Sequence, residues 1–539
     1  MKPSSFCTIC TKQCKDELIG FLLSLSIHHQ NEKVYIMCDT GTKTAVNNLT
    51  PQPKLNITWF IDLDKYSTYN RSQMSKLGIW SDFQMSKALV MKKALEENED
   101  TLFLDSDIII LDTIDNIDNS KDLGVSPQFI KKKNVDETGY YNGGTLWAKN
   151  KNIPDDWIEF TKTSRYFDQA SIEDLTTKYE YFEFGENYNL QTWRFILGLE
   201  PTNVIASYVN VKSGKIYYKK KPLKYIHTHF NQPNFKQINE FFIAKMKEAK
   251  LYKELMIIYR LIRGKWIIKI PKQPMSGLWR HKNDSFRQLA LLLKKNSKDV
   301  DIELIEQSGH CWLEPNILLY DRPTLEWCDN EITNSSLFLL GNGSMKTEGQ
   351  ILEAKGIVVK PWIFWARKPF MIEKLLNKMD ILTWEEREND SIFIGNFENK
   401  VQEKYRKTNH NWENVLTECH VTAGMKHLFT NEEYLMKLRN SKYGLCLRGY
   451  GSKCHREVEL MAFGTVPIVT PNVSILSYMD PPVENIHFIK VNNPEELKEK
   501  IKKITKEKWE EMSKACYEWY QRNIYSKNCW NTMMNNILY

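Results

Sequence analysis

Two carboxylates, Asp105 and Asp107, interrupt an apolar run in the segment TLFLDSDIIIL, residues 101–111. In an extended chain the side chains of residues i and i+2 point the same way, so both carboxylates can reach one hard divalent cation, which in turn bridges phosphate oxygens. The alternative is a pair of solvated aspartates in a turn. The apolar residues on both sides favour the metal site, because burying the pair without a partner is costly.

Two polar motifs follow further along the chain. Asn142, Gly143 and Gly144 are expected to form a tight polar turn that feeds a short strand, and glycine there lets the backbone approach a ligand closely. A plain hairpin turn is the alternative. Asp168 lies in the first turn of an expected helix that begins at Phe167, where its carboxylate either caps the helix or faces a sugar.

Two histidines and one lysine complete this first set of candidates. His227 and His229 lie at the end of the expected strand LKYIHTHF, residues 223–230, and at this spacing one imidazole is expected to bind the same metal. Within the expected helix at 81–97 most lysines face solvent, and Lys87 is the one expected to contact a nucleotide.

The order of these motifs resembles a known family. Asp-x-Asp, then Asn-Gly-Gly, then Asp168-Gln169, then a strand-terminal histidine is similar to the glycogenin and galactosyltransferase-like GT-A glycosyltransferases, over roughly the first 240 residues. The resemblance implies transfer of a sugar from a nucleotide sugar with Mn²⁺ or Mg²⁺ as cofactor. It also implies that Asp105, Asp107 and one histidine bind the metal, and that Asp168 and Gln169 lie near the donor sugar or the acceptor.

The elements that would position these residues alternate between strand and helix. Periodicity predicts strands at 6–11, 33–38 and 55–61 and helices at 16–29 and 81–97. This alternation predicts an α/β fold with a sheet rich in parallel strands.

A domain boundary is expected after this first series. The segment 264–277 contains two prolines and ends in glycine, which is typical of a linker. We therefore expect a GT-A domain at 1–250 and a helical linker at 251–285. Further strands are expected at 302–305, 317–319, 337–340 and 357–359, and the loop GNGSMKTEG, residues 341–349, is interpreted as a turn because its spacing is not G-x-G-x-x-G.

A second motif lies at 441–470, SKYGLCLRGYGSKCHREVELMAFGTVPIVT. An expected strand, a glycine-rich loop and a helix N-terminus follow one another here, and together they form a pyrophosphate site. Arg448, Lys453 and Arg456 supply charge suited to a diphosphate, and Glu459 can accept hydrogen bonds from ribose hydroxyls. The alternative is a structural ion pair between Arg456 and Glu459 on one helix face.

This second motif is similar to the exostosin family of GT-B glycosyltransferases, and the segment 391–406 extends the resemblance. The resemblance implies two Rossmann-like lobes, an acceptor-side lobe at 286–387 and a donor-nucleotide lobe at 388–539, and a reaction that needs no metal. The donor-site residues that it implies are Gly395, Asn396, Arg406, Arg448, Gly449, Gly451, Lys453, Arg456 and Glu459.

A general base for the second site is sought in the segment SGHCWLEPN, residues 308–316. His310 and Glu314 are the two candidates there, because histidine and glutamate are common proton acceptors in catalysis.

The composition limits the class of protein. The chain has 539 residues, is 42% hydrophobic and 26% charged, and carries a net charge of +7, which fits an ordinary globular chain with anionic small-molecule substrates and gives no nucleic-acid signature. The apolar patch at 18–25 is too short for a membrane helix, and eleven cysteines without a repeating frame are typical of reduced thiols. A cytoplasmic location without membrane insertion is expected.

The leading hypothesis is a bifunctional hexosyl- or pentosyltransferase that adds two sugars to a glycan or glycoprotein acceptor, one at a metal-dependent GT-A site and one at an exostosin-like GT-B site. Three alternatives are considered: a single active module whose other half holds the acceptor, a nucleotidyltransferase, and a noncatalytic glycan-binding protein. The 16 Trp and 25 Tyr residues are possible sugar platforms for the last of these.

Overall fold

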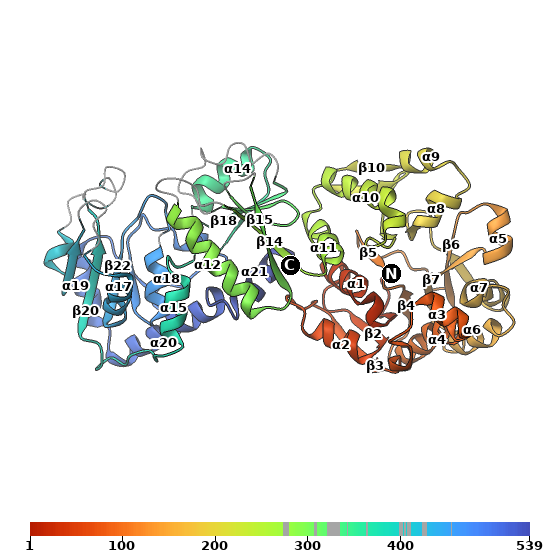
Figure 1. Cartoon of the computed structure of the whole chain (residues 1–539), viewed down its shortest axis with the longest axis horizontal. Helices are drawn as coiled ribbons and strands as arrows, with labels where there is room; N and C mark the ends of the chain where they lie inside the picture. Colours follow the sequence, from red (N-terminus) through yellow and green to blue (C-terminus); the bar gives the residue numbers. More distant parts are fainter. Residues whose placement is uncertain are drawn as a thin grey trace. The chain divides into compact units, whose positions relative to one another are not determined.

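The computed structural model describes residues 1–272, 280–306, 310–320, 335–341, 343–362, 365–397, 403, 406, 411–422, 428–453 and 455–539. The chain divides into two compact units, Met1–Lys265 and Trp266–Tyr539. Figure 1 draws the first unit from red to green and the second from green to blue. The expected α/β class is confirmed, because strands and helices alternate in both units.

The first unit is built on a seven-stranded sheet with the order β3-β2-β1-β4-β7-β6-β8. Its strands are β1 Phe6–Cys10, β2 Lys33–Cys38, β3 Asn56–Ile61, β4 Thr101–Leu104, β6 Leu123–Pro127, β7 Tyr141–Ala148 and β8 Tyr181–Glu183. The four strands from β3 to β4 are parallel, whereas β7 is antiparallel to both β4 and β6. Strands β1, β4 and β7 are buried along their whole length, which explains the nearly continuous apolar sequence of β1 and β4.

The helices of the first unit lie between these strands and after them. They are α1 Lys15–His28, α2 Thr40–Asn47, α3 Arg71–Lys76, α4 Trp80–Glu97, α5 Lys132–Thr138, α6 Ile153–Thr161, α7 Phe167–Lys178, α8 Thr192–Leu197, α9 Thr202–Ser207, α10 Lys236–Glu248 and α11 Tyr252–Arg263, with short 3-10 turns at Lys12–Cys14, Asp64–Tyr66 and Pro233–Phe235. Helix α4 packs on β1, β2 and β4, and its buried residues Val90, Met91 and Leu95 join the core under that face of the sheet.

Two small sheets complete the first unit. One has the order β5-β13-β9, with β5 Ile108–Ile110, β9 Leu190–Gln191 and β13 Tyr225–His227. The other has the order β10-β11-β12, with β10 Val209–Lys212, β11 Lys215–Tyr218 and β12 Lys221–Pro222. The first of these small sheets brings the end of β13 beside the residues that follow β4.

The second unit contains a mixed sheet of six strands in the order β15-β14-β16-β17-β18-β19. The strands are β14 Trp266–Pro271, β15 Val300–Ile305, β16 Cys311–Leu313, β17 Ile317–Tyr320, β18 Leu337–Leu340 and β19 Val359–Pro361. Helix α12, Arg280–Asn296, packs on β14 and β15 and contacts α15, Pro369–Leu376. A π-helical turn at Met345–Gly349 and helix α14, Gln350–Ala354, precede the last strand.

The second unit also contains a five-stranded parallel sheet in the order β21-β20-β22-β23-β24. The strands are β20 Asn389–Gly395, β21 Glu418–Val421, β22 Ser441–Cys446, β23 Val466–Val469 and β24 Ile489–Lys490. The accompanying helices are α17 Asn431–Arg439, α18 His455–Ala462, α19 Pro494–Lys503, α20 Lys506–Asn523 and α21 Cys529–Leu538, with short 3-10 turns at Trp412–Asn414 and Ile475–Ser477. The chain order of these strands reverses between β20 and β22.

The structure corrects the expected linker. Residues 251–285 were expected to be helical and to separate two domains, but they contain α11, strand β14 and the start of α12. Strand β14 pairs with both β15 and β16, and Pro271 is its last residue, so this part of the segment belongs to a sheet and is not a linker. The six-stranded sheet therefore begins at Trp266, ahead of the expected lobe boundary at 286. Residues 273–279 of this segment lie outside the described residues.

The structure also corrects the expected turn at Asn142 to Gly144. These residues lie inside β7, whose pairing with β4 extends to Thr145 opposite Leu104. The expected turn at 341–349 contains the π-helical turn, and Asn342 within it lies outside the described residues.

Candidate active site

Three backbone segments of the first unit meet where β4 ends. Asp105 and Asp107 lie in the turn between β4 and β5, and the backbone N–H of Asp105 donates to the carbonyl of Gly144 at 2.9 Å. Strand β13 runs antiparallel to β5 with His227 opposite Ile108, the residue after Asp107. Strand pairing therefore places the histidine beside the aspartates, although it comes much later in the sequence.

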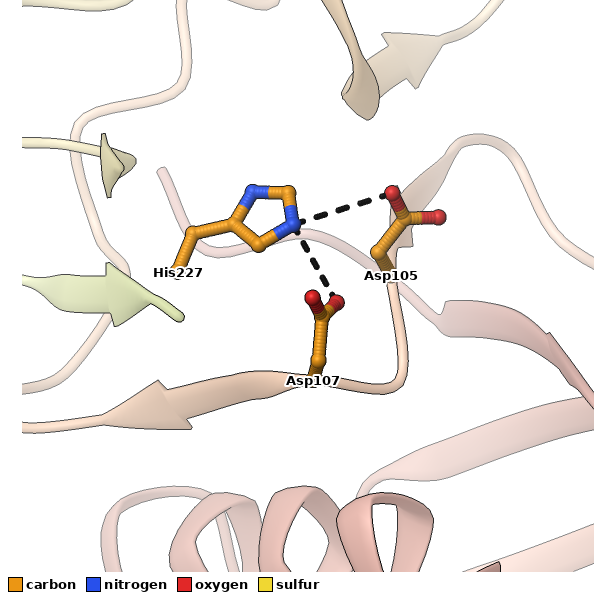
Figure 2. A group of neighbouring side chains, drawn as sticks. All are labelled: Asp105, Asp107 and His227. Carbon is orange, nitrogen blue, oxygen red and sulfur yellow. Dashed lines mark ion pairs between the residues drawn. The ribbon is translucent and has the colours of Figure 1, made fainter. Parts of the chain in front are cut away.

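Asp105, Asp107 and His227 form a cluster of possible metal ligands (Figure 2). The Nε2 atom of His227 lies 3.1 Å from Oδ1 of Asp107 and 3.8 Å from Oδ2 of Asp105, and the three ligand atoms all lie within 4.8 Å of one another. Two carboxylates and one imidazole are a donor set that suits Mn²⁺ among the first-row metals and accepts Mg²⁺ through its oxygens. Within the described part of the chain this is the one such cluster.

The ring of His227 is oriented by a second contact. Its Nδ1 atom lies 3.0 Å from Oδ1 of Asn189, and a ring N–H held by an amide oxygen leaves Nε2 to face the two aspartates. This is the arrangement that a metal-binding histidine requires. The residues present therefore fit a divalent cation.

The charges of the cluster depend on one another. Burial raises the pKa of Asp105 above its ordinary value, although the nearby Lys87 opposes this effect. Burial also acts to raise the pKa of Asp107, but the positive charges of His227 and His229 outweigh it and hold this pKa below its ordinary value. Burial lowers and the aspartates raise the pKa of both histidines, and the net pKa of His229 rises to about 9.

Lys87 of α4 is a buried cation between two carboxylates. Its Nζ lies 3.1 Å from Oδ1 of Asp105 and 3.0 Å from Oδ2 of Asp168, and it donates to the carbonyl of Gly143 at 3.0 Å. Burial acts to lower the pKa of Lys87, but Asp105 and Asp168 outweigh burial and raise it, so the ammonium stays charged. The ammonium thus holds Asp105, Asp168 and the backbone of Gly143 together. The sequence predicted a different role for Lys87, a contact with a nucleotide.

The two glycines of β7 make room for the acidic side chains. A Cβ atom added to Gly144 would lie 2.6 Å from Cε1 of His227 and still closer to Oδ2 of Asp105, and one added to Gly143 would lie 2.5 Å from Oδ2 of Asp168. A side chain at either position would therefore displace a residue of the site. The sequence predicted that these glycines let the backbone approach a ligand. In the structure they let the backbone approach the side chains of Asp105, His227 and Asp168.

Asn142 connects the site to β9. Its Oδ1 accepts from the backbone N–H of Gly144 at 3.1 Å and from Nδ2 of Asn189 at 2.9 Å, and its Nδ2 donates to Oε1 of Gln191 at 3.0 Å. All of these side chains are buried. Asn142 therefore stabilises the backbone that carries the metal cluster.

Asp168 does not cap its helix. Helix α7 has Tyr166 at the N-cap position without a side-chain cap, and the carboxylate of Asp168 points to Lys87 instead. Phe167, the preceding residue, has a φ of 41°, in the left-handed region that costs about 1–3 kcal/mol for a non-glycine residue. Gln169 donates to the carbonyl of Thr138 at 2.9 Å and so lies beside Asp168 at the start of the helix.

His229 lies outside the metal cluster. Its Nδ1 atom is 2.8 Å from Oε1 of Glu17 on α1 and 3.3 Å from Oδ2 of Asp107. Of the two histidines that the sequence offered, the structure therefore places His227 with its Nε2 toward both aspartates and His229 against Glu17.

Sequence reasoning did not find Glu17, Asn189 or Gln191. Gln191 lies opposite His227 because β9 and β13 pair in parallel, and Asn189 comes two residues earlier. Strand β9 has two residues, which is too short to show periodicity. Glu17 directly precedes an apolar stretch of α1 that is buried on all sides, and this position is a signal, because an unpaired buried carboxylate is rare.

The candidate donor residues of the second unit gather at the reversal of strand order between β20 and β22. Ligands of open α/β sheets bind outside the carboxyl ends of the strands at such a point. Gly395 ends β20, Asn396 follows it, and the loop with Arg448, Gly449 and Gly451 follows β22. Arg406 connects the two loops, because it donates to the carbonyls of Asn396 at 2.5 Å and Arg448 at 2.8 Å.

Arg456 lies under the end of β20. Its guanidinium donates to the carbonyl of Ile394 and stacks 4.5 Å from the ring centre of Phe393. A Cβ atom added to Gly395 would lie 2.9 Å from Nη2 of Arg456. The close approach of this arginine therefore explains why a glycine ends β20.

Two residues expected at the second diphosphate site are engaged by the protein. The buried Nζ of Lys453 donates to the carbonyls of Leu340, Trp362 and Ser477, and burial lowers its pKa to about 7. Glu459 is also buried. Its carboxylate accepts from the backbone N–H of Arg367 at 3.0 Å and from the hydroxyl of Tyr434 at 2.8 Å, in place of the expected contacts with ribose or Arg456.

The two expected general bases lie at the ends of β16, in the six-stranded sheet. His310 is buried. Glu314 is also buried, and its Oε1 lies 3.0 Å from Nζ of Lys269. The role of either residue as a general base stays a prediction.

Comparison with known proteins gives structural likenesses alone. No family model matches the chain, and neither does any curated protein. Among solved structures, it is similar to galactosyltransferase LgtC with donor and acceptor sugar analogues (13% identity, 45% of this chain and 95% of that one, TM-score 0.32). It is also similar to the bifunctional glycosyltransferase WbbM (12% identity, 47% of this chain and 52% of that one, TM-score 0.31). A third similar structure is the glycosyltransferase GlyE of Streptococcus pneumoniae TIGR4 (12% identity, 67% of this chain and 92% of that one, TM-score 0.27).

These likenesses are too distant to decide a function. The chain spans about half the length of WbbM. A separate finding concerns membranes: across the described ranges, no helix combines the length and the apolar character that a transmembrane segment needs.

Proposed function

We propose that the unit Met1–Lys265 transfers a sugar from a nucleotide sugar to a glycan or glycoprotein acceptor with the help of a divalent cation. The observation that supports this most is the convergence of Asp105, Asp107 and His227, whose ligand atoms lie within 4.8 Å of one another. Mn²⁺ or Mg²⁺ held by them would supply positive charge to the diphosphate that leaves the donor sugar.

The other residues of this site orient the reacting groups in the proposal. Lys87 keeps Asp105 and Asp168 in place through its two short ion pairs. Asp168 and Gln169 lie at the start of α7. The carboxylate of Asp168 would accept hydrogen bonds from hydroxyl groups of the donor sugar or of the acceptor, and the amide of Gln169 would donate hydrogen bonds to them. The order of these motifs along the chain, which resembles GT-A glycosyltransferases, supports the same assignment.

We further propose a second donor site, independent of metal, in the five-stranded sheet of the second unit. Its support is the position of Gly395, Asn396 and Arg448 at the strand-order reversal, together with the resemblance to exostosin-family GT-B enzymes. Arg406, Arg456, Gly449 and Gly451 would shape this site. Lys453 and Glu459 are left out of it because protein groups already occupy their polar atoms. In this proposal the acceptor-side lobe is the six-stranded sheet, which begins at Trp266.

One experiment separates these activities. The purified chain is incubated with a panel of hexose and pentose nucleotide sugars and glycan acceptors, with Mn²⁺ or with EDTA, and release of nucleoside diphosphate is measured. Two active modules predict one release that needs Mn²⁺ and disappears in Asp107→Asn, and another that persists in EDTA and falls in Arg448→Gln. Matched controls are Asp155→Asn and Arg522→Gln, which alter exposed ion pairs elsewhere.

Other outcomes would contradict parts of the proposal. If nucleoside diphosphate is released with Mn²⁺ but never with EDTA, the chain has a single active module, and its second half holds the acceptor. Release of pyrophosphate would indicate nucleotidyl transfer. Absence of turnover for every pair of donor and acceptor, with glycan binding retained, would identify a binding protein instead.

A further inference from the structure

The two aspartates of the metal cluster are held in a similar way by different partners. Oδ1 of Asp105 lies 3.1 Å from the ammonium of Lys87, while its Oδ2 faces Nε2 of His227 at 3.8 Å. Oδ2 of Asp107 lies 3.3 Å from Nδ1 of His229, while its Oδ1 faces the same Nε2 at 3.1 Å. In each carboxylate, one oxygen is therefore held by a protein cation and the other is turned toward the cluster.

The partner of Asp107 is itself fixed. Nδ1 of His229 lies 2.8 Å from Oε1 of Glu17, whose side chain is 4% exposed, so one ring N–H is shared between two carboxylates. The ring also stacks on Phe235, with centroids 5.9 Å apart and planes 25° from parallel. Burying a glutamate costs free energy unless it is paired, and in this structure its partner is the histidine that contacts Asp107.

We propose that Glu17 and His229 are positioning residues that hold Asp107 with Oδ1 available to a divalent cation. Glu17 sets the position of the His229 ring, and the ring N–H holds Oδ2 of Asp107. The carboxylate is then restricted to one orientation before the cation arrives, which lowers the entropy lost on binding. This inference rests on the metal site of the proposed function.

The chain offers a matched control for Glu17. Glu254 of α11 is also 4% exposed at its side chain, and its Oε1 lies 3.1 Å from Nε2 of His28. The Glu254–His28 pair has the same chemistry as the Glu17–His229 pair, and the described contacts of its two side chains do not include Asp107. Glu254→Gln therefore reproduces the loss of a buried carboxylate without touching the cluster.

The test is a titration of the full chain with Mn²⁺, without any sugar nucleotide, in which free Mn²⁺ is followed by electron paramagnetic resonance. Outer partners of metal ligands typically contribute about 10–100-fold to metal affinity. We expect a loss of that size in Glu17→Gln and in His229→Leu, and wild-type affinity in Glu254→Gln. His229→Asn keeps an N–H donor near the position of Nδ1 and should recover much of the loss. The Glu17→Gln/His229→Leu double variant should be no weaker than the weaker single variant, because the two residues act as one unit.

Thermal unfolding in EDTA controls for folding, and Glu17→Gln and Glu254→Gln should lose similar stability. Wild-type Mn²⁺ affinity in both Glu17→Gln and His229→Leu would overturn the positioning role while leaving the metal site standing. Equal loss of affinity in Glu254→Gln would overturn it too, since the effect would then be general to the fold. If the wild-type chain binds no Mn²⁺, Mg²⁺ or Co²⁺, the metal site of the proposed function fails first.

Discussion

Lys87 and Asp168 form an ion pair of 3.0 Å in which both side chains are at least nine-tenths buried. Lys87 also pairs with Asp105 at 3.1 Å, so one buried ammonium compensates two carboxylates. A charge at such a position is hard to remove, because its partners remain in a medium of low polarity. The stability of the first unit and the geometry of its metal cluster therefore depend on the same side chain.

Replacement of Lys87 by methionine should destabilise the first unit. Removing one member of a buried charge cluster costs about 3–5 kcal/mol, because the remaining charges lose their partner. Urea unfolding followed by tryptophan fluorescence measures the change. Lys92→Met, on the same helix, breaks an exposed pair with Asp155 and should cost less than about 1 kcal/mol. Equal effects of the two substitutions would contradict the role given to Lys87.

Alanine at Gly144 should impair cation binding. The added methyl group would collide with Oδ2 of Asp105 and with Cε1 of His227, 2.6 Å away, and such overpacking costs about 1–3 kcal/mol. If most of this cost falls on the cation complex, Mn²⁺ affinity drops by about tenfold for each 1.4 kcal/mol. The titration that measures it uses Gly41→Ala as control, since a methyl group there meets its nearest atom at 3.4 Å. Unchanged Mn²⁺ affinity in Gly144→Ala would show that the cluster tolerates a shift.

The stability of the first unit should depend on pH through His29. This histidine is 1% exposed, its Nε2 accepts from the backbone N–H of Ile114 at 2.9 Å, and burial lowers its pKa to about 3. The unfolded chain takes up a proton near pH 6.5, while the folded chain does so only near pH 3. This contribution to the free energy of unfolding is therefore fully present above pH 6.5 and is lost as the pH falls toward 3.

The measurement is urea unfolding at a series of pH values for wild type and His29→Gln. Glutamine keeps an acceptor for Ile114 but does not titrate, so the difference in unfolding free energy between the two chains should change by up to about 1.4 kcal/mol per pH unit. His420→Gln, in the second unit, is a control at a more exposed histidine. A difference that stays constant from pH 7 to pH 4 would be evidence against the neutral, buried state of His29.

Lysine at position 406 should weaken nucleotide binding in the second unit. The guanidinium of Arg406 bridges the carbonyls of Asn396 and Arg448, and a single ammonium does not reproduce this two-point contact. Loss of one such hydrogen bond to a charged group costs about 1.5–3 kcal/mol, part of which is expected in binding. Calorimetric titration with nucleoside diphosphates in EDTA isolates this proposed site from the proposed metal-dependent one. Arg522→Lys is the control, and equal affinities in all three chains would argue against a nucleotide at the strand-order reversal.

Local sequence patterns predicted several elements of both units. The strands at 33–38 in the first unit and 337–340 in the second, and the helix at 81–97, appear at or within one residue of their expected bounds. Both strands are buried along nearly their whole length and therefore show as continuous apolar runs in the sequence. Asp105 and Asp107 were found by spacing, and His227 by its place at a strand end. Glu17 and Asn189 were not found, since their contacts arise only when distant segments meet.

The errors have physical causes as well. Glycines are depleted in strands, so Gly143 and Gly144 indicated a turn, whereas the crowded acidic side chains require glycine within β7. The prolines and glycines of the segment 264–277 indicated a linker, although Pro271 is the last residue of strand β14. Lys453 had the spacing of a phosphate-binding residue, and only the fold reveals the three carbonyls that take its ammonium.

The pairing of β13 with β5 determines when, during synthesis of the chain, His227 can join the two aspartates. A growing chain that ends at Leu223 already contains both aspartates, but it lacks the strand that carries His227 to them. The proposed cation site is therefore completed late, after most of the first unit has been synthesised. Metal uptake by nested C-terminal truncations would time this event, as a step in Mn²⁺ binding when β13 is included.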